Sequence, residues 1–396
     1  MKTLFFFCLL LTLPFPASAR DYHVLPQGAG MRDGTRWEHA LDAATAMSLM
    51  KTGLQPGDRL RIGSGAYRGI EFGIGVTGTK AASILIEGVD TGGGLPVFSG
   101  QWDEKHPDKG SIIFTLTDSA AWVTLRGLHV RDAVVGVNAP RTKTGFARPG
   151  LRFENIDMER IRHGYYFSDC TDLTLATCTV RRYTKHGFRF EGGCVDVIVR
   201  QCVADCSEGD EAWERLTELL PFGFFANGAD VPNARLRFED CNASNHLMPL
   251  QKNKYNNGDG FVAEENNAEL VFIRCRAERN QDGGFDLKPK GVRLEECVGL
   301  RNSRNFRLWS HAEMKGCFSG LASDGIWAKD GPVTATGCTF HELKNAVSVD
   351  NDARAAVRLK DCLLHRVQRP LSEDTGGTLD MDDSNRQDDQ AAVKVP

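Results

Sequence analysis

Three aspartates recur at related places of a sequence repeat between residues 253 and 310, and their side chains could bind a metal ion. Asp259 and Asp282 each precede a glycine and phenylalanine phrase, and Asp286 follows the second phenylalanine. Carboxylates packed within a few ångströms repel one another unless a cation binds them. Because Ca²⁺ takes oxygen ligands at about 2.3–2.6 Å, the pattern predicts a weak calcium site. The alternative is a solvated row of turn residues, since Asp-Gly is a common turn dipeptide.

Basic and aromatic residues are expected on the same face as these aspartates. Side chains alternate in and out along a strand, so the residue after each repeated inward apolar residue points outward. The outward residues are Arg189, Asp286, Arg307 and Trp327 at one position, and Glu264, Lys288 and Trp309 two residues further along. Neighbouring strands lie about 4.8 Å apart. Arg307 is therefore expected one strand beyond Asp286, and Glu264 beside Lys288.

The candidate residues lie on short predicted strands that belong to a repeating sequence unit. A strand-like phrase ends in cysteine eight times, at Cys178, Cys202, Cys241, Cys275, Cys297, Cys317, Cys338 and Cys362. Most of the intervals are 20–24 residues, and glycine, asparagine and aspartate turns separate the apolar phrases. This period predicts an all-β fold over residues 20–370, a right-handed parallel β-helix of about ten coils. The consensus of leucine-rich repeats is missing.

The cysteines are expected to form an inward stack of small apolar side chains. Eleven of the 12 cysteines follow residue 19, an odd number that rules out complete pairing. A disulfide between Cys170 and Cys194 is the alternative in an exported protein. Side chains on neighbouring parallel strands point the same way, which suits that bond poorly.

The two ends of the chain differ from the repeat. Residues 1–19 have a lysine, an apolar run and an Ala-Ser-Ala site, which predicts a signal peptide and a secreted or periplasmic protein. Residues 37–51 have apolar residues at helical spacing, which predicts a helix that caps the first coil. Residues 371–396 are acidic and poor in large apolar residues, which predicts a disordered tail.

The charge balance excludes some partners. The chain has 48 basic and 52 acidic residues, and seven of the acids but only two of the bases lie in residues 371–396. The body is therefore close to neutral, without the basic field that nucleic-acid binding requires. Beyond the signal no apolar run is long enough for membrane insertion. We expect a monomer.

The segment around residues 253–310 resembles the family 9 polysaccharide lyases, pectate lyases that are right-handed parallel β-helices. The motifs that carry the resemblance are Asn256-Asn257-Gly258-Asp259-Gly260-Phe261, Asn280-Gln281-Asp282-Gly283-Gly284-Phe285-Asp286 and Asn302-Ser303-Arg304-Asn305-Phe306-Arg307. The opening, with Tyr22-His23-Val24-Leu25-Pro26, is similar as well. The resemblance implies calcium ligands at Asp259, Asp282 and Asp286, and the catalytic base at Arg307.

The chain departs from the pattern of that family at two positions. Gly283 stands where the family has an aspartate, which removes one carboxylate from the implied calcium site. Arg307 stands where the family has a lysine base, and arginine keeps its proton to a pKa above about 12. Lys288 lies one strand earlier on the same face and could be the base instead, because the pKa of lysine shifts more readily.

These observations favour an exported lyase that cleaves an acidic, uronate-containing polysaccharide by calcium-assisted β-elimination. In that reaction a cation neutralises the sugar carboxylate, and a base removes the C5 proton. Arg307 and Lys288 are the candidate catalytic residues. The expected substrate-binding residues are Arg189, Glu264, Trp309 and Trp327. The alternatives are a non-catalytic glycan-binding β-helix and a uronate C5 epimerase; a hydrolase would need an acid pair that the sequence does not identify.

Overall fold

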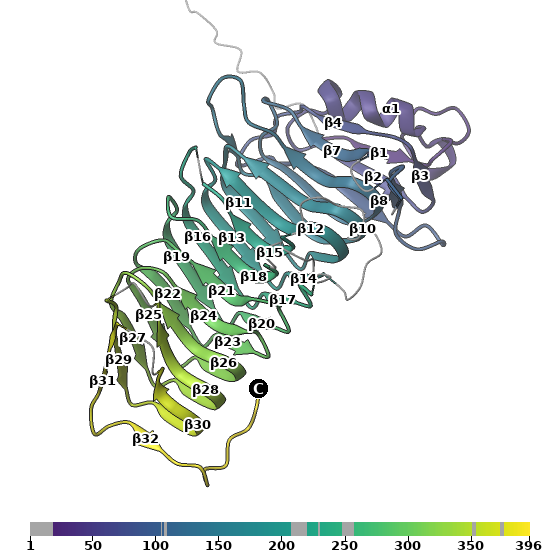
Figure 1. Ribbon diagram of the computed structural model, residues 1–396. Helices are drawn as coiled ribbons and strands as arrows, with labels where there is room; N and C mark the ends of the chain where they lie inside the picture. The colour runs from purple at the N-terminus through teal and green to yellow at the C-terminus, as the bar shows by residue number, and fades with distance from the viewer. Residues whose placement is uncertain are drawn as a thin grey trace, which may run out of the picture.

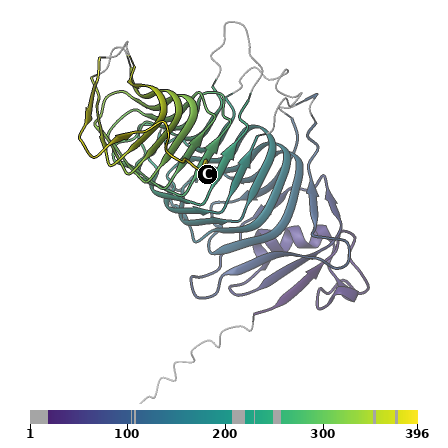
Figure 2. The same cartoon turned by 90° about the horizontal axis from the view of Figure 1, so that it is seen from below.

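The chain winds into a right-handed parallel β-helix, which confirms the predicted fold class. The computed structural model describes residues 19–103, 105–106, 109–206, 220–228, 230–247, 257–350, 354–372 and 376–396. Its coils stack in a column from the N-terminal to the C-terminal end (Figures 1 and 2). All of the expected signal segment except Ala19 lies outside the described residues.

Each coil contributes strands to three ladders of parallel pairs. The first ladder contains β4 (Phe72–Ile74), β7 (Ile112–Leu116), the later parts of β8 (Val123–Ala139), β10 (Arg152–Ser168) and β12 (Thr179–Gly192), β15 (Phe222–Ala226), β18 (Asp259–Ala263), β21 (Gly283–Leu287), β24 (Arg304–Leu308), and the later parts of β26 (Phe318–Ala328), β28 (Thr339–Val349) and β30 (Leu363–Leu371). This ladder carries the predicted site residues.

The other two ladders complete the coils. The second contains β1 (Asp21–Val24), β2 (Arg59–Gly63), β5 (Ile84–Val89), the first parts of β8 and β10, β9 (Arg148–Pro149), β11 (Cys170–Ala176), β13 (Val195–Arg200), β16 (Ala234–Glu239), β19 (Ala268–Ile273), β22 (Val292–Glu295), β25 (Ala312–Lys315), β27 (Val333–Thr336), β29 (Ala356–Lys360) and β31 (Thr378–Met381). The third contains β3 (Ala66–Arg68), β6 (Val97–Ser99), the middle of β8 and β10, the start of β12, β14 (Val203–Asp205), β17 (Asn242–Ser244), β20 (Arg276–Glu278), β23 (Val298–Leu300), the first parts of β26, β28 and β30, and β32 (Arg386–Gln387).

A short helical segment lies at the N-terminal end, as predicted, but it is irregular. It consists of the 3-10 turn η1 (Trp37–His39), the α-helix α1 (Ala43–Ser48) and the π-helical turn η2 (Leu49–Gly53). The Asp42 carboxylate caps α1 by accepting a hydrogen bond from Thr45 N at 2.8 Å. Ala43, Ala46 and Met50 are buried against the first coils, so the segment shields core that would otherwise face water.

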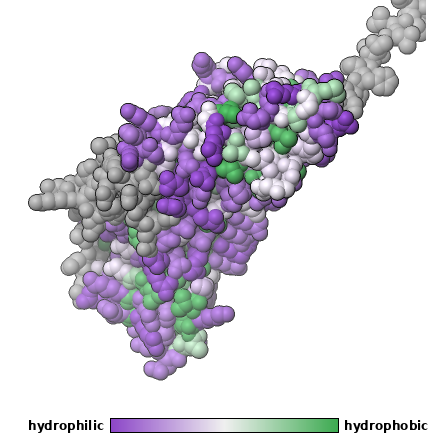
Figure 3. Space-filling view, turned by 90° about the vertical axis from the view of Figure 1, so that its right-hand side faces the viewer, coloured by the Kyte–Doolittle hydropathy of each residue, from purple (hydrophilic) through white to green (hydrophobic). Residues whose placement is uncertain are grey.

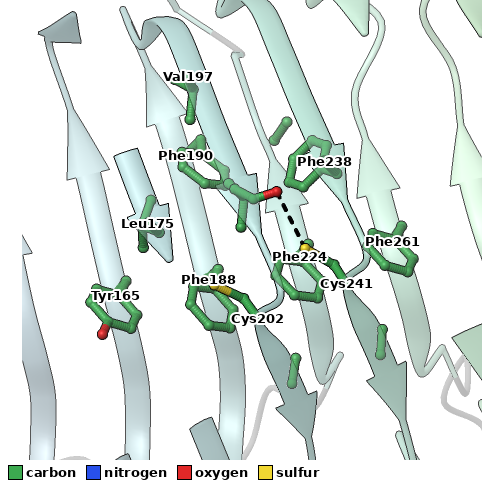
Figure 4. Close-up of a cluster of buried hydrophobic side chains, with 14 of the residues drawn as sticks. Tyr165, Leu175, Phe188, Phe190, Val197, Cys202, Phe224, Phe238, Cys241 and Phe261 are labelled. Carbon is green, nitrogen blue, oxygen red and sulfur yellow. Dashed lines mark hydrogen bonds between the residues drawn. The ribbon is translucent and has the colours of Figure 1, made fainter. Parts of the chain in front are cut away.

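A stack of aromatic rings runs through the core behind the first ladder. Its members, Tyr165, Phe188, Phe224, Phe261, Phe285 and Phe306, stack with ring centroids 4.7–5.0 Å apart. Figure 4 shows part of this stack beside Cys202 and Cys241. The spacing follows from the strand separation, because identical positions of successive coils lie one strand apart. The predicted inward stack is therefore confirmed.

The cysteines form a second inward stack. All eleven cysteines after residue 19 are buried and free, so the alternative of a Cys170–Cys194 disulfide is not formed. Cys241 Sγ donates a hydrogen bond to Val199 O of the preceding coil at 3.4 Å (Figure 4). From Cys170 onward, small thiols thus fill part of the core and make weak hydrogen bonds to backbone oxygens.

The C-terminal segment differs from the prediction of a disordered tail. In its described part, β31 pairs with β29 and β32 pairs with β30, so the β-helix continues beyond residue 370. Arg276 Nη1 also donates a hydrogen bond to Pro396 O at 3.0 Å. The acidic residues are compatible with these strands because alternate side chains face water. The prediction of disorder from composition was therefore wrong for this segment, because the preceding coil provides strands with which it pairs.

The surface of the described chain is polar. Figure 3 shows a largely hydrophilic side with small hydrophobic patches near both ends. No helix among the described residues has the length and apolar character needed to cross a membrane. The large apolar side chains are instead concentrated inside the coils.

His246 makes the stability of the fold sensitive to acid. Its ring is buried between Tyr183 and Asn280, and burial lowers its pKa from 6.5 to about 4. The unfolded chain then binds a proton at a higher pH than the folded chain, so stability falls as pH drops below about 6.5. From pH 7 to pH 5 we expect this residue to cost about 2 kcal/mol of unfolding free energy.

Urea unfolding at both pH values can measure this effect, with His246→Gln as the comparison. The variant should lose less stability on acidification than the wild type. His163 and His186, whose pKa values burial also lowers, act in the same direction in both proteins, whereas the raised pKa of Asp259 acts in the opposite direction. An equal pH dependence in both proteins would contradict the prediction.

Candidate functional site

The predicted outward positions fall into register on the first ladder. Val262 of β18 pairs with Asp286 of β21, Asp286 with Arg307 of β24, and Arg307 with Trp327 of β26. Each pair is one strand apart, because the parallel ladder aligns the same position of successive coils. The structure therefore brings Asp286, Arg307 and Trp327 together in one row.

Arg307 lies between two of the three aspartates. Its Nη1 donates a hydrogen bond to Asp282 Oδ2 at 2.9 Å and lies 3.3 Å from Asp286 Oδ2. Arg304 Nη1 donates a hydrogen bond to the other oxygen, Asp282 Oδ1, at 2.6 Å. Sequence reasoning missed Arg304, although its register position opposite Gly283 was a usable signal. Two guanidinium groups thus neutralise two of the carboxylates.

Asp259 completes the carboxylate cluster and is fully buried. Its Oδ1 accepts a hydrogen bond from Gly283 N, whereas its Oδ2 is buried without a hydrogen-bond partner in the described part of the chain. Burial raises the pKa of Asp259 well above its usual range, and the charges of Asp286 and Asp282 raise it further. Burial also raises the pKa of Asp286, against the lowering effect of Arg307. A buried carboxylate of this kind favours its neutral form.

As arranged, these residues do not fit the predicted calcium site. Calcium needs several oxygen ligands that converge on one point, and here the guanidinium of Arg307 lies where Asp282 and Asp286 converge. Among the residues that the structure describes, no group of three or more His, Cys, Asp or Glu side chains could hold a metal ion. The Oδ2 of Asp259, which has no hydrogen-bond partner among the described residues, is an oxygen that a cation could bind.

The outer layer of the site is a tryptophan flanked by two lysines. Lys288 Nζ and Lys329 Nζ lie 5.5 and 4.7 Å from the ring centroid of Trp309. Trp309 Nε1 donates a hydrogen bond to Asp286 Oδ1, which fixes the ring above the carboxylate cluster. Lys288 Nζ also donates a hydrogen bond to Glu264 Oε2 at 2.6 Å, which confirms the predicted proximity of this pair.

Trp327 and Lys329 extend this layer by one strand. The Trp327 ring lies edge-on to the Trp309 ring at 5.0 Å, and Arg307 Cζ lies 5.4 Å from both ring centroids. No role was assigned to Lys329 from the sequence. Its place two residues after Trp327 repeats the spacing of Lys288 after Asp286.

Arg189 belongs to a different part of the same row. It pairs with Phe225, which pairs with Val262, which pairs with Asp286, so two strands lie between Arg189 and Asp286. Its guanidinium lies 4.7 and 5.3 Å from the rings of Tyr166 and Phe225. It also donates a hydrogen bond to Glu191. The structure therefore separates Arg189 from the other predicted site residues.

Comparisons with known proteins identify the fold. No protein-family model matches the sequence, and no curated protein shows a significant match. Among solved structures, pectate lyase Pel9A is similar, with 15% identity and a TM-score of 0.54 over 95% of this chain and 82% of that chain. At this identity the likeness shows a shared fold alone.

Two other solved structures are similar to the same degree. A mannuronic acid-specific polysaccharide family 6 lyase from human gut microbiota has 10% identity and a TM-score of 0.55, covering 91% of this chain and 87% of that chain. The A-module of the mannuronan C-5 epimerase AlgE6 from Azotobacter vinelandii has 13% identity and a TM-score of 0.52, covering 83% and 90%. They support the parallel β-helix.

Proposed function

We propose that the protein is a lyase that cleaves a uronate-containing polysaccharide by β-elimination. The observation that carries this proposal is the outer layer, in which Lys288 and Lys329 flank the ring of Trp309. An indole ring offers an apolar face to a sugar ring, the ammonium group of Lys329 attracts a sugar carboxylate, and Lys288 lies close enough to take part in proton transfer. The similar structures named above, two lyases and an epimerase, also favour a polysaccharide. The predicted signal peptide favours a substrate outside the cytoplasm.

Lys288 is our candidate for the base. Its side chain is 22% exposed, whereas the side chain of Arg307 is 8% exposed and contacts two carboxylates that favour its charged form. Lysine also gives up its proton more readily than arginine. We therefore assign Arg307 to the carboxylate cluster rather than to proton transfer.

The reaction follows from these positions. Lys329 neutralises the carboxylate of the bound uronate, which makes its C5 proton more acidic. Once the ammonium of Lys288 has given a proton to solvent, its amine takes the C5 proton, and the electron pair of the C5–H bond forms the C4–C5 double bond. The C4–O bond breaks, and the departing sugar oxygen takes a proton from water. The mechanism uses no metal ion.

The remaining predicted substrate-binding residues would extend the site. Trp327 supports the ring of Trp309, and the hydrogen bond to Glu264 positions the side chain of Lys288. Arg189 lies four strands from Arg307, which corresponds to about 19 Å along the ladder. A polysaccharide that lies along the ladder would reach Arg189 several sugars away from the cleaved bond.

An ultraviolet assay tests the proposed reaction. Purified protein is incubated with a panel of uronate polymers, including polymannuronate, polyguluronate and polygalacturonate, and the C4–C5 double bond of the product is followed by its absorbance. A rise in absorbance that depends on the protein is expected for at least one polymer. Binding without a rise would favour the glycan-binding alternative, and altered C5 configuration without a rise would favour an epimerase. Both of those results contradict the lyase proposal.

Trp309 is expected to contribute mainly to substrate binding. The Trp309→Ala variant should raise KM by roughly tenfold, equivalent to ~1.4 kcal/mol, because the sugar loses its stacking surface. Trp309→Phe is the matched variant, since it keeps an aromatic face but loses the hydrogen bond to Asp286. It should retain most of the affinity. An unchanged KM in the alanine variant would place the sugar elsewhere.

A further inference from the structure

The carboxylate cluster has a cation of its own, the guanidinium of Arg307. Its Nη1 lies 2.9 Å from Asp282 Oδ2 and 3.3 Å from Asp286 Oδ2. Asp259 is fully buried beside them, and its Oδ2 has no hydrogen-bond partner in the described part of the chain. Arg304 contacts Asp282 through its other oxygen, Oδ1, so the positive charge that lies between the carboxylates is that of Arg307, and the cluster still has an unpaired oxygen that could bind a cation.

Gly283 provides the room that Arg307 needs. A Cβ atom at this glycine would lie 2.8 Å from Asp259 Oδ1, 3.3 Å from Arg307 Cδ and 3.4 Å from Asp286 Cβ. Any side chain at this position would enter the cluster and crowd the arginine. The two departures from the lyase pattern, the missing aspartate and the arginine, are thus physically linked. A side chain at residue 283 and the arginine at residue 307 would compete for the same space.

We propose that Arg307 is the built-in counter-ion of this cluster, in the place that a divalent cation would occupy. Removing its guanidinium would then create a site for a hard divalent cation such as Ca²⁺, formed by Asp259, Asp282 and Asp286. Calcium accepts mixed shells of carboxylate and water oxygens with flexible geometry, so three carboxylates suffice for weak binding. This inference concerns ion binding alone and does not depend on the proposed reaction.

Calorimetric titration with CaCl2 tests the proposal without any substrate. The wild type should show no saturable binding, whereas Arg307→Ala should bind Ca²⁺ saturably, at concentrations at least tenfold below the highest at which the wild type is titrated. Millimolar Ca²⁺ should also raise the Tm of Arg307→Ala but leave that of the wild type unchanged. Adding Gly283→Asp to Arg307→Ala should tighten binding further, because a fourth carboxylate enters the vacated space.

Two controls separate this site from other calcium binding. Arg307→Ala combined with Asp282→Asn should lose both the calorimetric signal and the Tm rise, and Arg307→Lys, which keeps the positive charge, should not bind. Saturable binding by the wild type that Asp282→Asn abolishes would overturn the proposal. So would an Arg307→Ala variant that binds no better than the wild type, or one that stays unfolded even in calcium, because the ion is expected to replace the guanidinium.

Discussion

Turnover of a uronate polymer is expected to fall by roughly 10²–10⁴-fold when Lys288 is replaced by alanine. The reason is that no other described amine lies at the same place: Lys288 Nζ is 5.5 Å from the Trp309 ring and hydrogen-bonds to Glu264. KM should change much less than kcat, because Lys329 and Trp309 still bind the sugar. Steady-state kinetics with the ultraviolet assay gives both values.

Lys290 provides a matched control for this experiment. It is exposed two residues further along the chain, so Lys290→Ala removes the same charge and should leave turnover unchanged. Arg307→Lys tests the competing assignment, since a base at that position should retain or increase turnover with lysine. Full activity of the Lys288→Ala variant would rule out the proposed base. Full activity in both Lys288→Ala and Arg307→Ala would show that the proposed reaction does not take place on this face of the β-helix.

Replacing Phe285 with alanine is expected to lower the free energy of unfolding by about 3–5 kcal/mol. Phe285 stacks between Phe261 and Phe306 at 4.8 and 5.0 Å and lies edge-on to Phe272 at 5.9 Å. The strands that carry these rings are held by ladder hydrogen bonds, so the coil cannot collapse to fill the cavity. Urea unfolding followed by circular dichroism measures the loss.

The exposed Phe146 is the control for this loss of stability. Its side chain is 77% exposed, so Phe146→Ala should leave the unfolding midpoint unchanged. Phe285→Leu should recover part of the stability because it refills much of the volume. A Phe285→Ala variant as stable as the wild type would mean that the ring stack contributes little to the fold.

The repeat and the register of its strands could be predicted from the amino-acid sequence alone. Recurring cysteines and phenylalanines at one position per coil place identical positions on neighbouring strands, and side-chain alternation then places Asp286 beside Arg307 and Glu264 beside Lys288. These relationships depend only on the repeat period and on alternation along a strand. For that reason the fold and the rows of its outward face could be predicted without the structure.

The pairing of the side chains in the site depends on how the coils pack in three dimensions. A repeat period places backbones, but a long side chain chooses its direction from the space and the charges around it. Because Gly283 has no side chain, Arg307 has room to enter the carboxylate cluster, where the sequence predicted calcium. Burial of Asp259 and the second guanidinium at Arg304 likewise depend on neighbouring coils. The C-terminal strands form for the same reason, because a preceding coil offers them an edge to pair with.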